Sequence, residues 1–140
     1  EFLKAKVDAG ADYICTQLFF DNRDFYDYRE RCELAGINVP IIAGIMPITS
    51  GGTYGRLPGL ALGSRYPAKL ARRIERHEDD NAAIRRVGVD WATQQCRDLL
   101  DNGVAGIHFY TLNRSTATME IYRRLGAEDS SDLAELAEEA

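Results

Sequence analysis

Three short apolar runs alternate along the chain with segments in which apolar residues recur every three or four positions. The runs are rich in β-branched and aromatic residues, and their apolar residues do not alternate with polar ones. This is typical of strands in a parallel sheet buried on both faces. The spacing between the runs is typical of amphipathic helices. The sequence therefore predicts strands at residues 13–21, 39–47 and 106–111.

The predicted helices begin and end at residues that favour helix caps. Asp21 suits an N-cap, and Gly126 suits the position just after a helix. Residues 48–66 are rich in glycine, serine and threonine, so we expect an irregular segment with one weak helix near residues 57–62. The other helices are predicted at residues 2–9, from Asp21 or Asn22 to Gly36, from Pro67 to near His77, from Asp79, Asp80 or Asn81 to Gly103, and from Asn113 or Ser115 to Gly126.

A strand followed by a helix, three times over, predicts an α/β fold with a parallel sheet. An open doubly wound sheet would need a phosphate-binding loop, and neither GxGxxG nor GxxxxGKS/T follows any of the predicted strands. A (β/α)8 barrel instead places ligand-binding groups at the carboxyl ends of its strands, where Gln17, Met46 and Tyr110 stand in this sequence. The barrel is therefore the better fit.

The chain is too short to close such a barrel alone. Its 140 residues supply about three βα units, whereas a closed barrel takes about 250 residues. We therefore expect residues 1–126 to be the C-terminal part of a (β/α)8 TIM barrel from a larger enzyme, and the lack of an initiator methionine favours the same view. Residues 127–140 are acidic and low in complexity, and we expect them to form a loosely ordered tail.

The composition is typical of a soluble globular protein, with 45% hydrophobic and 28% charged residues. The net charge of −5 provides no basic field for nucleic acid or anionic lipid, so neither is expected as a partner. No apolar stretch approaches the roughly 20 residues of a membrane helix, and the start shows no signal-peptide pattern. Three separated cysteines without a CxxC pair fit a reducing, cytoplasmic setting.

Gln17 is the polar residue that interrupts the first apolar run. Burying a carboxamide costs a few kcal/mol unless its donors and acceptor find partners. Two interpretations remain open: a structural glutamine bonded to nearby backbone, or one that recognises the amide-like edge of a heterocycle. Asp21, at the turn after this strand, is better explained as a helix cap than as a catalytic group.

The segment around the third strand is also rich in polar and aromatic groups. Tyr110 could stack on a ligand or bond to one, or simply find a nearby carbonyl. Arg114 would lie at a helix N-terminus, where a carboxylate or phosphate partner would offset the unfavourable dipole, although it could also be an unpaired surface arginine. Lys6 could meet a phosphate, but a solvated helix lysine is the default. No metal site is expected, because two histidines and three scattered cysteines provide no ligand spacing.

Five blocks of the sequence stand out together: KVDAGAD at residues 6–12, TQLFFD at 16–21, PIIAGIMPI at 40–48, DDNAAIRRVGV at 79–89 and HFYTLNR at 108–114. In this order they closely resemble the methylenetetrahydrofolate reductase family, over residues 6 to about 126. The resemblance implies a (β/α)8 barrel that holds FAD at the C-terminal ends of its strands. It also implies reduction of 5,10-methylenetetrahydrofolate to 5-methyltetrahydrofolate by NADH or NADPH, in one-carbon and methionine metabolism, with both substrates taking turns against the flavin.

The resemblance also implies roles for four residues. Gln17 would be the catalytic-site glutamine that contacts the folate's pterin ring, Tyr110 and Arg114 would bind the folate, and Lys6 would contact FAD near its phosphates. The full-length parent could form a homo-oligomer, and the isolated chain should be inactive because most flavin contacts lie outside it. The alternatives are a non-catalytic barrel fragment that acts as a binding or assembly module, and another (β/α)8 enzyme with an anionic ligand at Arg114.

Overall fold

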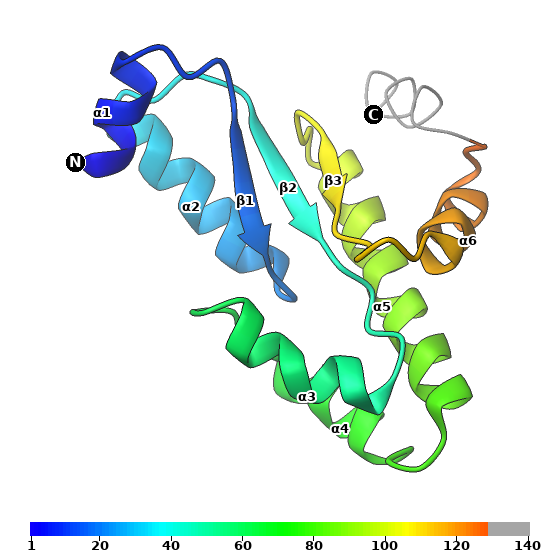
Figure 1. Cartoon of the computed structure of the whole chain (residues 1–140). Coiled ribbons are helices and arrows are strands. Elements are labelled where there is room, and N and C mark those ends of the chain that lie inside the picture. Colours follow the sequence, from blue (N-terminus) through cyan, green and yellow to red (C-terminus); the bar gives the residue numbers. More distant parts are fainter. Residues whose placement is uncertain (129–140) are drawn as a thin grey trace.

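A three-stranded parallel sheet forms the centre of the structure, a computed structural model in which residues 1–128 are described (Figure 1). Its strands are β1 (Ile14–Leu18), β2 (Ile41–Ile45) and β3 (Ile107–Phe109), in the order β1-β2-β3. Both pairs of neighbours run parallel. The predicted α/β fold with a parallel sheet is confirmed, although each strand is shorter than its apolar run because the ends of the run leave the sheet.

Six helices accompany the sheet in the described part of the chain. Asp21 caps the second helix by accepting a hydrogen bond from the Arg23 amide at 3.1 Å, and Asp80 caps the fifth by accepting one from the Ala83 amide at 2.9 Å. Gly126 ends the last helix with a left-handed φ of 87°, so these predicted caps are confirmed. The helices are α1 (Phe2–Asp8), α2 (Asn22–Leu34), α3 (Gly51–Leu60), α4 (Ala68–Glu75), α5 (Asn81–Asp101) and α6 (Thr116–Leu125).

Helices cover one face of the sheet. Figure 1 shows α2 and α5 behind the strands, and α6 packs against α5. Ile45 from β2, Leu99 from α5 and Ile121 from α6 are fully buried in the core between these layers. The other face, turned toward the viewer, has no helix packed on it among residues 1–128. Helices on one face and a sequential strand order are consistent with part of a (β/α)8 barrel.

β1 is more exposed than its apolar run predicts. Burial on both faces is expected from the sequence, but Cys15 and Gln17 are exposed while Ile14 and Leu18 are buried. The prediction is wrong because the described helices cover only one face of β1, so residues that point to the other face are exposed. Gln17 is therefore not the buried carboxamide that the pattern suggests.

The glycine-rich segment after β2 forms the helix α3, so the prediction of an irregular segment at residues 48–66 is wrong there. Ser50 caps the helix, since its side chain accepts a hydrogen bond from the Thr53 amide at 3.1 Å. Leu57 is only 1% exposed and anchors the helix in a second apolar cluster beyond the strand ends. Capping and burial together outweigh the low helix propensity of glycine.

Pro58 lies inside α3 and has no amide hydrogen to donate to the carbonyl of Tyr54, one turn earlier. The Tyr66 hydroxyl donates to that carbonyl instead, at 2.7 Å. Tyr54 and Tyr66 also stack, with ring centroids 4.4 Å apart. A side chain beyond the helix thus replaces the hydrogen bond that proline removes.

α5 approaches the exit of β2 very closely. A Cβ atom at Gly88 would lie 1.8 Å from the carbonyl oxygen of Ile48, so a larger residue there would have to displace backbone. This contact fixes the direction in which the chain leaves β2.

The chain continues past α6 with Ala127, which is 2% exposed and donates its amide to the carbonyl of Tyr122 at 2.9 Å. The rest of the predicted acidic tail, residues 129–140, lies outside the described residues. Within residues 1–128, no helix has the length and apolar character needed to cross a bilayer.

Candidate functional site

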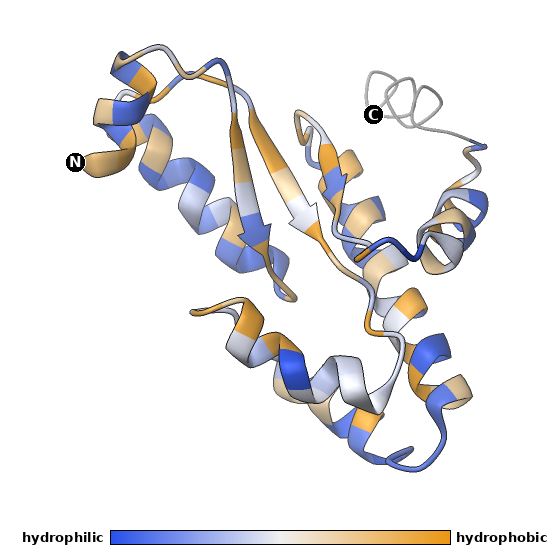
Figure 2. Cartoon of the chain, in the orientation of Figure 1, coloured by the Kyte–Doolittle hydropathy of each residue, from blue (hydrophilic) through white to orange (hydrophobic). Residues whose placement is uncertain are grey.

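The carboxyl ends of the three strands bring together residues that are far apart in sequence. Gln17 lies near the end of β1, Gly44 near the end of β2, and Tyr110 directly after β3. Tyr110 extends the sheet, because its amide donates to the carbonyl of Ile45 at 2.8 Å. Figure 2 shows hydrophilic residues at the arrowhead of β1, in a strand whose first half is apolar. The carboxyl edge of a parallel sheet is where such folds bind ligands.

β1 contains a bulge at this edge. Three steps along β1, from Cys15 to Leu18, oppose only two steps along β2. The Thr16 hydroxyl takes the place of a backbone acceptor there, since it accepts the Gly44 amide at 2.9 Å and donates to the carbonyl of Gln17, also at 2.9 Å. A bulge of this kind redirects the side chain beside it.

Tyr110 reaches across β2 to this bulge. Its hydroxyl donates to the carbonyl of Thr16 at 3.0 Å. Gly44 leaves room for the crossing, because a Cβ atom there would lie 2.9 Å from the Tyr110 ring and 2.7 Å from the Thr16 carbonyl oxygen. Burial raises the pKa of the Tyr110 hydroxyl, and the nearby Cys15 thiol adds to the shift, so the hydroxyl stays a donor. The His108 ring contacts the Tyr110 ring edge-on at 4.7 Å.

The Gln17 carboxamide is half bonded. Its oxygen accepts the Leu18 amide at 2.9 Å. Because a backbone amide can only donate, the oxygen and not the nitrogen of Gln17 must face it. The nitrogen has no hydrogen-bond partner among residues 1–128, and the side chain is exposed. Gln17 therefore presents two N–H donors at the strand ends.

A groove of about 600 Å³ runs along the outer edge of β1 and contains Gln17. The loop after α3 forms one side of it. In that loop the Ser64 hydroxyl donates to the carbonyl of Leu18, and Arg65 pairs with Asp24 at 3.0 Å. The groove is lined by Leu3, Ile14, Cys15, Thr16, Gln17, Leu18, Phe19, Asp24, Phe25, Tyr28, Leu62, Gly63, Ser64 and Arg65.

The family model for methylenetetrahydrofolate reductase matches residues 1–126 of this chain. Methylenetetrahydrofolate reductase (NADH) 1 of Arabidopsis thaliana is 39% identical over 132 residues, which are 94% of this chain. A probable methylenetetrahydrofolate reductase (NADPH) of Caenorhabditis elegans is 40% identical over 126 residues, and the 5,10-methylenetetrahydrofolate reductase of Escherichia coli is 38% identical over 124, each covering 89% of this chain. This chain belongs to the methylenetetrahydrofolate reductase family.

The chain spans only part of the length of these reductases. It covers 22% of the Arabidopsis protein, 19% of the Caenorhabditis protein and 42% of the Escherichia protein. Residues of a complete site that lie elsewhere in such proteins have no counterpart here. The chain therefore corresponds to only a part of each of these proteins.

Arg114 lies at the same edge of the sheet as Gln17 and Tyr110. It follows a tight turn in which Leu112 and Asn113 have positive φ angles of 47° and 63°, and its own amide donates to the Thr111 carbonyl at 2.9 Å. Positive φ is uncommon outside glycine, and such turns often occur at functional sites. The Arg114 side chain is exposed and forms no ion pair with the residues that the structure describes. It is free to meet an anionic group.

The fourth predicted site residue, Lys6, does not lie near Gln17, Tyr110 and Arg114. It is exposed in the last turn of α1, and its carbonyl accepts the Ala11 amide at 3.3 Å. Figure 1 shows α1 beside the amino end of β1, away from the arrowheads. Its assignment to FAD stays a prediction.

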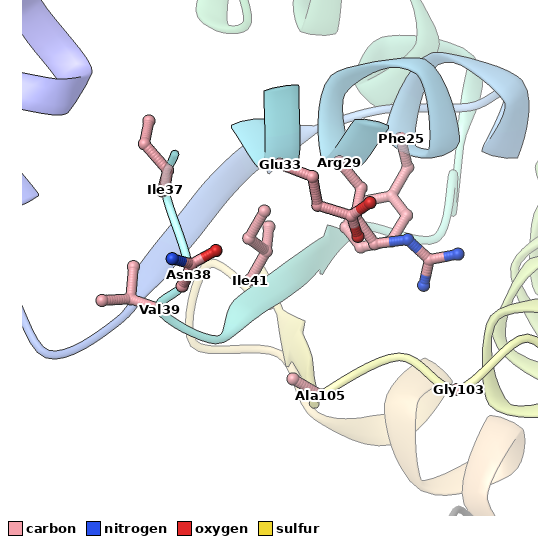
Figure 3. Close-up of a pocket in the computed structure, with 9 residues that line it drawn as sticks. All are labelled: Phe25, Arg29, Glu33, Ile37, Asn38, Val39, Ile41, Gly103 and Ala105. Atoms are coloured by element: carbon pink, nitrogen blue, oxygen red, sulfur yellow. The ribbon is translucent and has the colours of Figure 1, made fainter. Parts of the chain in front are cut away.

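A second hollow, of about 370 Å³, lies at the amino end of β2 (Figure 3). Its charged groups are Arg29, which donates to the Asn102 carbonyl at 3.0 Å and lies over the Tyr26 ring, and Glu33. It contains none of the four predicted site residues, and no cluster of three metal-ligating side chains occurs within residues 1–128. The lining residues are Phe25, Arg29, Glu33, Ile37, Asn38, Val39, Ile41, Gly103 and Ala105.

Thr16 and Gly44 are parts of this edge that the sequence does not single out, and His108, which the sequence pattern favours as a core residue without a catalytic role, is exposed beside Tyr110. Thr16 sits directly before Gln17, and His108 shares a strand face with Tyr110 because alternate residues point the same way. Those two could have been found from the position of their neighbours. Gly44 could not, since its role depends on a phenol ring that crosses from another strand.

Proposed function

We propose that this chain forms the folate-facing part of a flavin-dependent methylenetetrahydrofolate reductase, which reduces 5,10-methylenetetrahydrofolate to 5-methyltetrahydrofolate with NADH or NADPH. The observation that carries the proposal is the exposed Gln17 amide, whose two N–H donors have no partner among residues 1–128, beside Tyr110 at the carboxyl ends of parallel strands. The sequential strand order and the helices on one face of the sheet support a (β/α)8 barrel, of which three strands form one part.

The family resemblance implies roles for three residues, and the chemistry of each residue suits its role. Gln17 donates hydrogen bonds to acceptor atoms on the pterin ring of the folate. Tyr110 offers a ring face next to it. Arg114 carries a guanidinium that forms no ion pair with residues 1–128, which suits the carboxylates of the folate's glutamate part.

The residues present fit one side of a bound flavin. The groove beside β1 is lined mostly by apolar side chains with a few polar groups, as planar cofactors require. A bound flavin would carry the hydride between the nicotinamide and the folate. Lys6 would hold its phosphates, a role taken from the family resemblance alone. The relatives' names specify NADH for the Arabidopsis protein and NADPH for the Caenorhabditis protein, so either donor is compatible. A cytoplasmic setting remains part of the proposal.

The test is steady-state kinetics of the complete protein with Gln17→Ala. We expect kcat/KM for methylenetetrahydrofolate to fall about tenfold or more, since a donor to a heterocycle is typically worth about 1–2 kcal/mol, while bound flavin per protein stays constant. Gln94→Ala, at an exposed glutamine of α5, is the matched control and should change neither quantity. A wild-type protein with no flavin and no NAD(P)H-dependent turnover of this folate would overturn the proposal, as would a Gln17→Ala variant with unchanged folate kinetics.

A further inference from the structure

Thr16 connects all three strands at the candidate site. Its hydroxyl accepts the Gly44 amide of β2 and donates to the carbonyl of Gln17 in β1. Its own carbonyl accepts the Tyr110 hydroxyl from the end of β3. Three groups, one from each strand or its end, therefore bond to this one residue.

The bulge determines where the Gln17 side chain goes. In a regular strand the Thr16 side chain would not bond to the neighbouring strand's amide, and the backbone would pair directly. Here the extra residue lets the Thr16 hydroxyl fill the gap opposite Gly44. The same shift puts the Leu18 amide within 2.9 Å of the Gln17 oxygen, so the carboxamide nitrogen faces away from the protein.

We propose that Thr16 is a positioning residue for Gln17, held by the Gly44 amide on one side and by the Tyr110 hydroxyl on the other, so that Gln17 offers donors to an acceptor edge of the ligand. Thr16 acts through Gln17 and not by contact with the ligand. The ligand's matching chemistry is a carbonyl oxygen or an unprotonated ring nitrogen, because the remaining Gln17 atoms donate. This inference rests on the proposed function, since it assigns a mechanism to the same glutamine.

Two substitutions separate the hydroxyl of Thr16 from its bulk. Thr16→Val keeps the shape and removes the hydroxyl, which leaves the Gly44 amide without its acceptor. We expect kcat/KM for the folate to fall about tenfold, the usual consequence of an unpaired buried donor at a site. Thr16→Ser keeps the hydroxyl and should stay within about twofold of the parent protein. Thr93→Val, which removes another buried hydroxyl from α5, should leave the folate kinetics unchanged.

The deciding experiment is a double-mutant cycle in the complete protein, with Gln17→Ala and Thr16→Val alone and together. If Thr16 acts through Gln17, then Thr16→Val should change kcat/KM by less than about twofold once Gln17 is already alanine. Additive losses would overturn the inference and leave the proposed function standing, as would a neutral Thr16→Val beside a harmful Gln17→Ala. A neutral Gln17→Ala would instead overturn the proposed role of the glutamine. If Thr16→Val does not fold, Thr16→Ala takes its place in the cycle, because it also removes the hydroxyl that accepts the Gly44 amide.

Discussion

Hydrogen-bond partners separate the side chains that hold this structure from those whose polar groups stay available. Gln95 on α5 is buried, and its amide donates to the Phe19 carbonyl at 3.2 Å and to the Asn22 side chain at 3.1 Å. Gln17 is exposed and leaves its amide donors unpaired in the described part of the chain. Gln95 is therefore the structural carboxamide, and it holds the exit of β1 where Gln17 presents its donors.

Thr118 also lacks a hydrogen-bond partner, but unlike Gln17 it lies in the core. It is a buried polar residue whose hydroxyl has no partner among residues 1–128. Removing an unpaired buried hydroxyl without changing shape removes a desolvation cost. We predict that Thr118→Val raises the free energy of unfolding of the complete protein by about 1 kcal/mol, measured as a higher midpoint in thermal denaturation. Thr93→Val is the control, because the Thr93 hydroxyl donates to the Val89 carbonyl at 2.8 Å and its loss should not stabilise. An equal rise in both variants would contradict the explanation.

At the scale of elements, α3 depends on a contact from outside itself. Its glycines favour no helix, and its proline removes a backbone bond. Tyr66 supplies the missing donor to the Tyr54 carbonyl, and burial raises the pKa of the Tyr66 hydroxyl, which keeps it protonated. α3 therefore depends on Tyr66 for its middle turn.

Tyr66→Phe should expose this dependence. The variant keeps the ring stacked on Tyr54 and loses only the hydrogen bond, so we expect a loss of about 1 kcal/mol in the free energy of unfolding. In a Pro58→Ala background the helix recovers its own amide donor, and Tyr66→Phe should cost clearly less. A denaturation cycle over the four proteins measures the difference. Equal costs in both backgrounds would show that the Tyr66 hydroxyl does not replace the missing backbone bond.

The same elements show what the sequence could predict. Caps such as Asp21, Asp80 and Gly126 are local signals, so the ends of α2, α5 and α6 that they mark lie where the sequence predicts them. Of α3, only the end is predicted, as the weak helix near residues 57–62, because the stability of the helix comes from a buried leucine and from Tyr66, neither of which is a local propensity. Gln17 is found as a polar interruption, but its exposure depends on which face of β1 the helices cover, and that is a property of the fold. The hydrogen bond from Tyr110 to Thr16 joins residues 94 positions apart. Neither this contact nor the bulge can be predicted from a pattern within one strand.

At the scale of the whole molecule, the layers are joined by ion pairs on the side away from the open sheet face. Glu120 on α6 accepts from Arg85 at 2.6 Å and from Arg124 at 2.7 Å, and Arg124 also pairs with Asp90 of α5. Asp90 lies 3.6 Å from Arg73 of α4. These pairs connect three helices, and α6 begins directly after the turn that carries the candidate folate-binding arginine. The network thus supports the position of the site.

The Glu120 carboxylate makes this connection dependent on pH. The hydrogen bond from Arg85, more than any other effect, lowers the pKa of Glu120 below its ordinary value of 4.5. A carboxyl whose pKa is lower in the folded state stabilises the protein fully at a pH above its pKa in the unfolded state. That contribution is lost as the pH falls through its pKa in the folded state.

Because the pair is partly exposed, we expect Glu120→Gln to cost roughly 0.5–1 kcal/mol in the free energy of unfolding near neutral pH. That cost should decrease as the pH drops below 4.5 and vanish once the folded carboxyl is protonated as well. Thermal denaturation of both proteins across this range measures it, with Glu30→Gln at an exposed α2 position as the control for losing one charge. If the loss in the free energy of unfolding caused by Glu120→Gln stays constant with pH, then the packing of the Glu120 side chain, and not its charge, stabilises the protein.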